Sequence, residues 1–214
     1  EQKGTGRWTT EAALSFGVPT PTLAAAVFAR LVSAMKPTRV DLAHQLKGPD
    51  SVSALPPKAQ VIEALSKALL VARILAFVQG FHLIAEASRQ RQWQIPLRTV
   101  ASVWQAGCIL RGELLKPIQQ AFARSPEGLL LADPQMAQVL NAHQSDLRTV
   151  VQWANAAGVA VPCMSSAIDY WDGMRCAVSS ARLTQAQRDY FGAHTYERVD
   201  QAGVFHTDWS NFNP

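Results

Sequence analysis

The sequence predicts an all-α protein, a single large helical domain over residues 1–214 with one long central helix and an extended C-terminal tail. Prolines and glycines separate helix-length runs that are rich in Ala, Leu, Gln and Arg. No run alternates apolar and polar residues for long enough to require a sheet. With 48% hydrophobic and 17% charged residues, the 214-residue chain has the composition of a globular protein, which excludes a disordered tail.

The limits of the expected helices follow from the nearest prolines, glycines and capping residues. The helices are expected at about Thr10–Phe16, Pro21–Met35, Lys58–Arg91, Arg98–Ala106, Gly112–Arg124, Pro134–Ala157, Ser165–Cys176 and Leu183–Gly192. In Pro134–Ala157 apolar residues recur every three or four positions, as on one face of a helix. Residues from about 195 to 214 are expected to form the tail, in which Gly203–Trp209 is short, aromatic and extended.

The central helix, Lys58–Arg91, contains no proline and a single glycine, Gly80. It is apolar on most of its circumference, so other helices or a partner subunit must surround it. Residues 68–87 approach the length of a membrane span, but they include Arg73, Gln79, His82 and Glu86. Because a charge near the centre of a bilayer costs about 2.5–3.5 kcal/mol, we expect a core helix and no membrane contact.

Charge and cysteine content narrow the function classes. Twenty Lys and Arg against 16 Asp and Glu give a net charge of +4, and the basic residues are dispersed among acids, so no nucleic-acid partner is expected. Cys108, Cys163 and Cys176 lie far apart without a Cys-x-x-Cys pair, which indicates neither a disulfide framework nor a metal site. We expect reduced thiols in a cytoplasmic protein. The chain starts without Met, so we expect it to be part of a longer protein.

The opening segment, Lys3–Glu11, is the first candidate site. It offers two flexible glycines, a hydroxyl and two cations, which are Gly4, Gly6, Thr5, Lys3 and Arg7. Thr9 or Thr10 could cap the helix that follows, and the free N–H groups at a helix start bind phosphate. The alternative is a capped loop with a solvated lysine, because two spaced glycines are a weak signal.

Three cations elsewhere in the chain could also bind an anion. Gly192 is expected as the C-cap of the helix Leu183–Gly192, which would place Arg188 in the last turn and His194 just beyond it. The alternative for these two residues is an ordinary cation at a helix end and a packed histidine. Arg30 lies in an apolar run, so we expect it to be buried beside an anionic ligand or a structural carboxylate.

Several segments resemble the C-terminal domain of 6-phosphogluconate dehydrogenase, the decarboxylating NADP enzyme. They are Lys3–Thr9, Phe16–Pro19, Val27–Arg30, Gln79–Phe81, Trp104–Arg111, Gln185–Tyr196 and Phe205–Trp209. The last two are specific to this family, and the similarity extends nearly from end to end. Ala106 departs from a glycine of the family pattern, and Arg7 replaces a common lysine.

The resemblance implies an oxidoreductase of the pentose phosphate pathway and gluconate utilisation. The family oxidises 6-phosphogluconate at C3 with NADP, releases CO2 and forms ribulose 5-phosphate without a metal. The residues that would bind the substrate phosphate are Lys3, Thr5 and Arg30, together with Arg188 and His194 from the other subunit of a homodimer. The family's tail enters that neighbouring subunit, so a homodimer with exchanged tails is implied.

The resemblance also implies what lies outside residues 1–214. In the family an N-terminal Rossmann domain binds NADP, and the following helix carries the lysine that acts as general base and the glutamate that acts as general acid. We therefore expect no catalytic residue in this chain, and no activity from the chain alone. The alternative function is a non-catalytic, stand-alone dimerisation or interaction module with an idle anion site.

Overall fold

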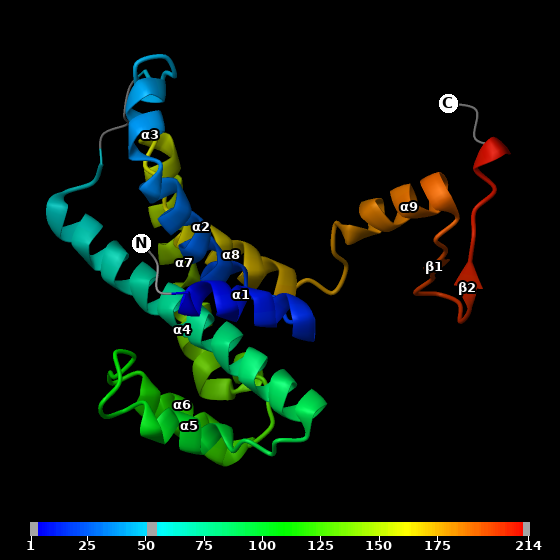
Figure 1. Cartoon of the computed structure of the whole chain (residues 1–214), viewed down its shortest axis with the longest axis horizontal. Coiled ribbons are helices and arrows are strands. Elements are labelled where there is room, and N and C mark those ends of the chain that lie inside the picture. The colour runs from blue at the N-terminus through cyan, green and yellow to red at the C-terminus, as the bar shows by residue number, and fades with distance from the viewer. Residues whose placement is uncertain (1–3, 51–54, 212–214) are drawn as a thin grey trace. The chain divides into compact units, whose positions relative to one another are not determined.

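The structure, a computed structural model, describes residues 4–50 and 55–211 and confirms the all-α fold (Figure 1). The helices are α1 (Thr5–Phe16), α2 (Pro21–Ala34), α3 (Lys36–Ala43), α4 (Lys58–Arg91), α5 (Leu97–Val103), α6 (Leu115–Arg124), α7 (Pro134–Ala156), α8 (Pro162–Met174) and α9 (Ala181–Gly192). Two short 3-10 turns, Leu130–Ala132 and Trp209–Asn211, complete the helical part. The sheet found in the described residues is one antiparallel pair, β1 (Tyr196–Glu197) and β2 (Val204–Phe205).

The chain forms two compact units, residues 1–171 and residues 172–214. The first unit contains α1 to α7 and most of α8, and the second contains α9, the β1–β2 pair and the last 3-10 turn. The second unit therefore begins well before the tail that we expected from residue 195. The expectation of one domain over residues 1–214 stays a prediction.

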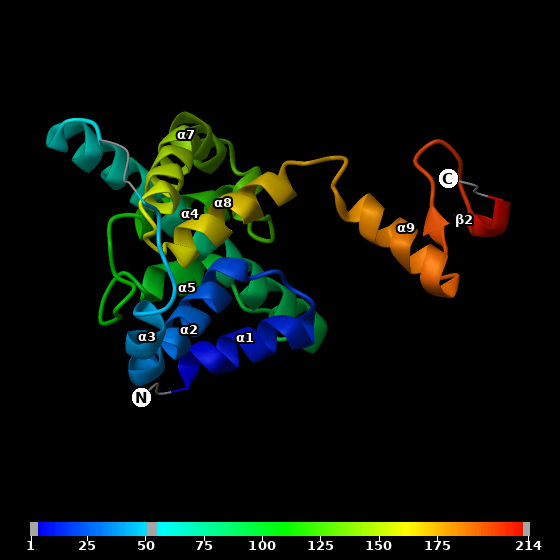
Figure 2. The same ribbon diagram turned by 90° about the horizontal axis from the view of Figure 1, so that it is seen from above.

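In the first unit, α4 packs along α7 and contributes more buried apolar side chains to the core than any other described helix (Figure 2). Its buried side chains lie on several faces, as expected for a helix apolar on most of its circumference. Phe81 of α4 lies between two other rings, with centroids 4.9 Å from Phe122 and 5.1 Å from Trp104. No helix in the described parts of the chain is long and apolar enough to cross a membrane.

A buried amide joins α4 to the start of α2. Gln79, fully buried in α4, accepts a hydrogen bond from the backbone N–H of Thr22 at 2.9 Å and donates one to the Thr22 hydroxyl at 2.8 Å. The first N–H groups of a helix have no partner within the helix. Gln79 therefore caps α2 from another helix and fixes where α2 begins against the core.

The structure corrects three expectations about helix limits. The first helix begins at Thr5 rather than Thr10, so Thr9 and Thr10 do not cap it; their hydroxyls donate to carbonyls one turn earlier. The unexpected α3 follows Met35 directly, because a proline at the second helical position is tolerated. The C-cap of α9 is Ala193, with φ of 49°, and Gly192 is the last helical residue.

Candidate functional site

A cavity of about 360 Å³ lies between the start of α1 and the middle of α2. Its lining includes Thr5 and Arg30, which were both predicted from the sequence to bind an anion. The other lining residues are Gly4, Gly6, Thr9, Leu23, Ala26 and Val27. One cavity is therefore lined by two predicted site residues that lie 25 positions apart in the chain.

The start of α1 suits an anion, although its backbone differs from the expected loop. Gly4 precedes the helix with a left-handed φ of 95° and has no side-chain cap. The helix ladder begins with the bond from Trp8 N–H to the Gly4 carbonyl, at 2.9 Å, so the preceding N–H groups are left for a ligand. These groups carry the positive end of the helix dipole.

Gly6 allows α1 and α2 to approach each other closely. A Cβ atom at this position would lie 2.9 Å from Cγ2 of Val27, which is closer than real side chains pack. Glycine at position 6 is therefore explained by helix packing rather than by a flexible loop. The close approach brings Arg30, one turn beyond Val27 on α2, to the same cavity as Thr5.

Arg30 is exposed in this chain, and the expectation that it is buried is wrong. The apolar residues around it, such as Phe28, Leu31 and Val32, are themselves largely exposed, so they do not enclose the guanidinium. Arg30 makes no ion pair or hydrogen bond within the described residues, which leaves its donors for a ligand. Lys3, the other predicted cation of this group, lies outside the described residues.

Arg188 and His194 lie in the second unit, near the C-terminal end of α9. Both side chains are exposed. Arg188 makes one long hydrogen bond, from Nη1 to Oε1 of Gln185 at 3.4 Å. The His194 ring lies against Gly192, where an added Cβ would come within 3.0 Å of Cδ2 and Nε2. Within the described residues, neither side chain has an anionic partner.

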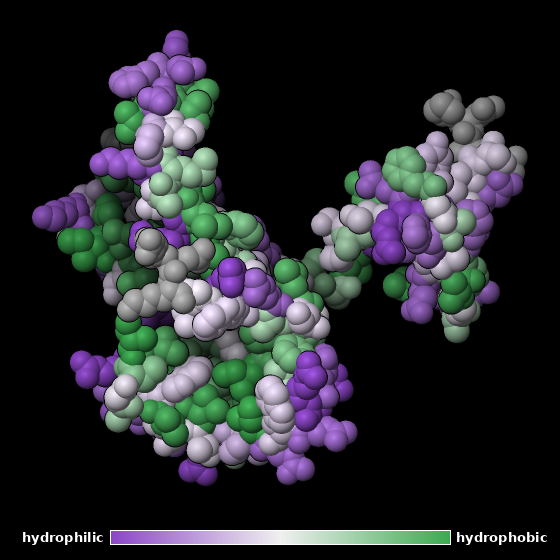
Figure 3. All heavy atoms as spheres, in the orientation of Figure 1, coloured by the Kyte–Doolittle hydropathy of each residue, from purple (hydrophilic) through white to green (hydrophobic). Residues whose placement is uncertain are grey.

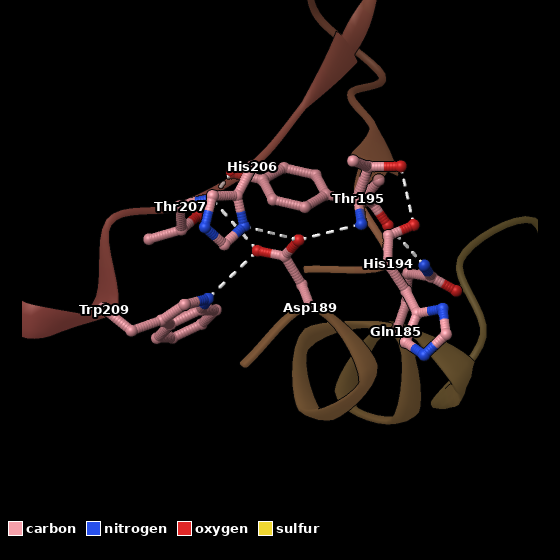
Figure 4. A network of polar contacts seen from close by, with 8 residues as sticks. Gln185, Asp189, His194, Thr195, His206, Thr207 and Trp209 are labelled. Carbon is pink, nitrogen blue, oxygen red and sulfur yellow. Dashed lines mark hydrogen bonds and ion pairs between the residues drawn. The ribbon is translucent and has the colours of Figure 1, made fainter. Parts of the chain in front are cut away.

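Asp189, which was not among the predicted site residues, accepts four hydrogen bonds within the second unit (Figure 4). It is fully buried. Its Oδ1 accepts from Thr195 N and from His206 Nδ1, each at 2.9 Å, and its Oδ2 accepts from Thr207 N and Trp209 Nε1, each at 3.0 Å. Burial alone would raise the pKa of this carboxyl, but the hydrogen bonds from Thr207, His206 and Trp209 outweigh it and hold the pKa at about 2.

A larger cavity of about 860 Å³ lies beside the C-terminal half of α4 and contains none of the predicted site residues. Its arginine, Arg89, already makes two hydrogen bonds with the carboxylate of Glu86. An anion there would have to displace that carboxylate, so this cavity suits a phosphate poorly. In residues 4–50 and 55–211 no group of three His, Cys, Asp or Glu side chains could hold a metal ion.

The family model described as "6-phosphogluconate dehydrogenase, C-terminal domain" matches residues 1–209. The chain belongs to this family. It is 45% identical over 209 residues to the NADP(+)-dependent, decarboxylating 6-phosphogluconate dehydrogenase of Bacillus subtilis, covering 97% of this chain and 45% of that protein. It is 43% identical over 209 residues to the decarboxylating 6-phosphogluconate dehydrogenase of Escherichia coli K12, with 97% and 44% covered.

The fold comparison agrees with the sequence comparison. The solved structure of Plasmodium falciparum 6-phosphogluconate dehydrogenase, described in its apo form and with NADP+ or 6-phosphogluconate, superposes with a TM-score of 0.91 at 31% identity. The match covers 97% of this chain and 45% of that one. The chain thus corresponds to the C-terminal domain of 6-phosphogluconate dehydrogenase and spans less than half the length of these relatives.

Proposed function

We propose that this chain supplies the substrate-binding and dimerisation part of a decarboxylating 6-phosphogluconate dehydrogenase. The observation that carries the proposal is the shared cavity of Thr5 and Arg30 at the start of α1. A phosphate there would accept hydrogen bonds from the free N–H groups of α1 and from an arginine without another partner in the described residues. Both are donors that proteins use for phosphate.

Lys3, Arg188 and His194 complete the proposed site. Lys3 directly precedes the N-cap of α1 and would add a second cation, beside Arg30, to the first group. Arg188 and His194 would come from the second copy of a homodimer, each tail reaching the other subunit's cavity. Several cations around one ligand suit a phosphate monoester, which carries up to two negative charges near neutral pH.

Exposed apolar side chains support the proposed association of two copies. Along α2 and at its C-cap the exposed group consists of Phe28, Leu31, Val32 and Met35, and apolar atoms continue over the surface of this region (Figure 3). In the second unit Tyr190 and Phe191 are also exposed. Apolar surface of this kind is normally covered in the assembled protein, either by a second copy or by other parts of the full-length chain.

The residues described here do not fit NADP. A dinucleotide site needs a parallel sheet with a glycine-rich turn into a helix, whereas the sheet in this part of the chain is a two-residue antiparallel pair. We therefore infer that the cofactor is bound mainly elsewhere in the full-length protein. It follows that the isolated chain, in the cytoplasm or in vitro, has no dehydrogenase activity.

Thermal unfolding with and without 6-phosphogluconate tests the proposal. A ligand at 100 times its Kd stabilises the folded state by about 2.7 kcal/mol, which raises Tm by roughly 5–10 °C for a chain of this size. The increase should disappear in Arg30→Ala and Arg188→Ala and persist in the controls Arg98→Ala and Arg182→Ala, whose arginines are exposed. Turnover of 6-phosphogluconate by the isolated chain would contradict the predicted inactivity.

The exposed apolar group on α2 also favours a second candidate, the stand-alone dimerisation module. That function predicts a dimer in gel filtration whose Tm is unchanged by 6-phosphogluconate or phosphate in wild type and in Arg30→Ala. A monomer at micromolar concentration would contradict the stand-alone dimerisation module, and it would mean that the tail and the long helix do not join subunits without the rest of the full-length protein.

A further inference from the structure

We propose that Asp189 is a positioning residue, whose buried carboxylate fixes the turn that carries His194 and thereby sets the place of His194 relative to Arg188. The inference rests on the function proposed above, in which these two cations bind the substrate phosphate. Asp189 itself has no free acceptor for a ligand, since its two oxygens already accept four hydrogen bonds.

The turn around His194 has an unusual backbone. The residues on both sides of it, Ala193 and Thr195, have left-handed φ angles of 49° and 60°. Side chains other than glycine, and β-branched ones above all, rarely adopt this conformation. The turn therefore does not hold its own shape, and contacts from elsewhere must stabilise it.

Side chains of α9 hold both polar backbone groups of Thr195. Its N–H donates to Oδ1 of Asp189 at 2.9 Å, and its carbonyl accepts from Nε2 of Gln185 at 2.5 Å. Figure 4 shows both side chains reaching this residue from the helix. The His194 ring makes no hydrogen bond within the described residues, so its position follows from the backbone on either side of it.

The same side chains connect the turn to Arg188. Arg188 and Asp189 lie three and four residues after Gln185 along α9, so each is a helical neighbour of Gln185. Gln185 accepts the hydrogen bond from Arg188 while donating to the carbonyl of Thr195. One side chain therefore links the guanidinium to the turn that carries the imidazole.

Asp189 also ties the tail to this turn. His206 Nδ1 is protonated and donates to Oδ1, because a carboxylate oxygen only accepts. Oδ2 accepts from the N–H of Thr207 and from the indole N–H of Trp209. An asparagine could satisfy only part of this set, since its NH2 group would face N–H donors. Whichever way its amide is oriented, the Asp189→Asn substitution should thus lose either the bonds from Thr195 and His206 or those from Thr207 and Trp209, while changing one atom.

The test compares Asp189→Asn, His194→Ala and their double variant in the full 214-residue chain. Asp200→Asn is the matched control, because Asp200 is an exposed acid of the same unit that pairs with Arg198. Calorimetry gives the affinity for 6-phosphogluconate, and NMR hydrogen exchange follows the amides of Thr195 and Thr207. Gln185→Leu provides a second perturbation that leaves the four bonds of Asp189 in place.

Asp189→Asn should lose protection at Thr195 or at Thr207 and bind about tenfold more weakly, as His194→Ala does, and the double variant should be no weaker than either. Gln185→Leu should lower the affinity for 6-phosphogluconate about threefold, and it should lower it no further when His194 is already alanine. Asp200→Asn should bind with wild-type affinity. Additive losses in the double variants, or wild-type affinity in Asp189→Asn, would overturn the inference.

If the wild-type chain binds no 6-phosphogluconate at all, the proposed function fails and the binding part of the inference fails with it. The hydrogen-exchange measurement still tests the fixed turn separately from the proposed function. Loss of protection at Thr195 or Thr207 in Asp189→Asn would support the fixed turn, and full protection of both amides in that variant would refute it.

Discussion

Replacing Gln79 by methionine tests how much the cap between α4 and α2 contributes to stability. The substitution keeps the length of the side chain and removes both hydrogen bonds to Thr22. The N–H of Thr22 then stays buried without a partner, which costs about 1–3 kcal/mol, while the hydroxyl loses roughly 1 kcal/mol of net hydrogen bonding. We expect the free energy of unfolding to fall by about 2–4 kcal/mol.

Urea unfolding followed by circular dichroism measures this change as a shift of the midpoint at constant slope. Gln60→Met is the matched control, because Gln60 is exposed on the same helix, and it should stay within about 0.5 kcal/mol of wild type. Thr22→Val should cost less than Gln79→Met because it removes only the hydroxyl, and the two losses should be non-additive. A Gln79→Met variant as stable as wild type would refute the account of α2 capping.

Two further predictions concern glycines and acid. Gly6→Ala should destabilise the chain by about 1–2 kcal/mol in the same urea assay, because overpacking against Val27 exceeds the gain in helix propensity. Gly80→Ala should stabilise the chain by roughly 0.5–1 kcal/mol, because no atom lies within 4 Å of the added Cβ. The pKa of Asp189 is about 2 in the folded chain and about 3.9 when unfolded, so the unfolded state takes up the proton first. The contribution of the ionised Asp189 to the free energy of unfolding is therefore complete above about pH 5 and is lost as pH falls through about 2. Trp209 fluorescence should report this loss in wild type and not in Asp189→Asn.

Much of the fold could be predicted from short-range signals. The limits of α4 were correct because Pro57 precedes it and no proline follows until residue 96, after the helix has ended. The start of α1 was wrong because two glycines favoured a loop. In the structure only Gly4 has the left-handed backbone, and Gly6 lies within the helix, where the packing of Val27 excludes a side chain.

The candidate site depends on contacts that sequence spacing does not encode. Thr5 and Arg30 were selected for their chemistry, and their common cavity follows from how α1 packs on α2. The expected burial of Arg30 was wrong because its apolar neighbours lie on the exposed side of α2. Asp189 was missed because its four donors lie 6 to 20 residues further along the chain, beyond any helical period.

The bond between Gln79 and Thr22 also constrains the order in which the chain can become structured during synthesis. The two residues are 57 positions apart, so at about 5–20 residues per second the partner of Thr22 emerges from the ribosome roughly 3–11 seconds later. A nascent α2 spends that interval with an unsatisfied first turn and its apolar side chains in water. Binding by a chaperone is therefore expected to be strongest in the window before residue 79 appears.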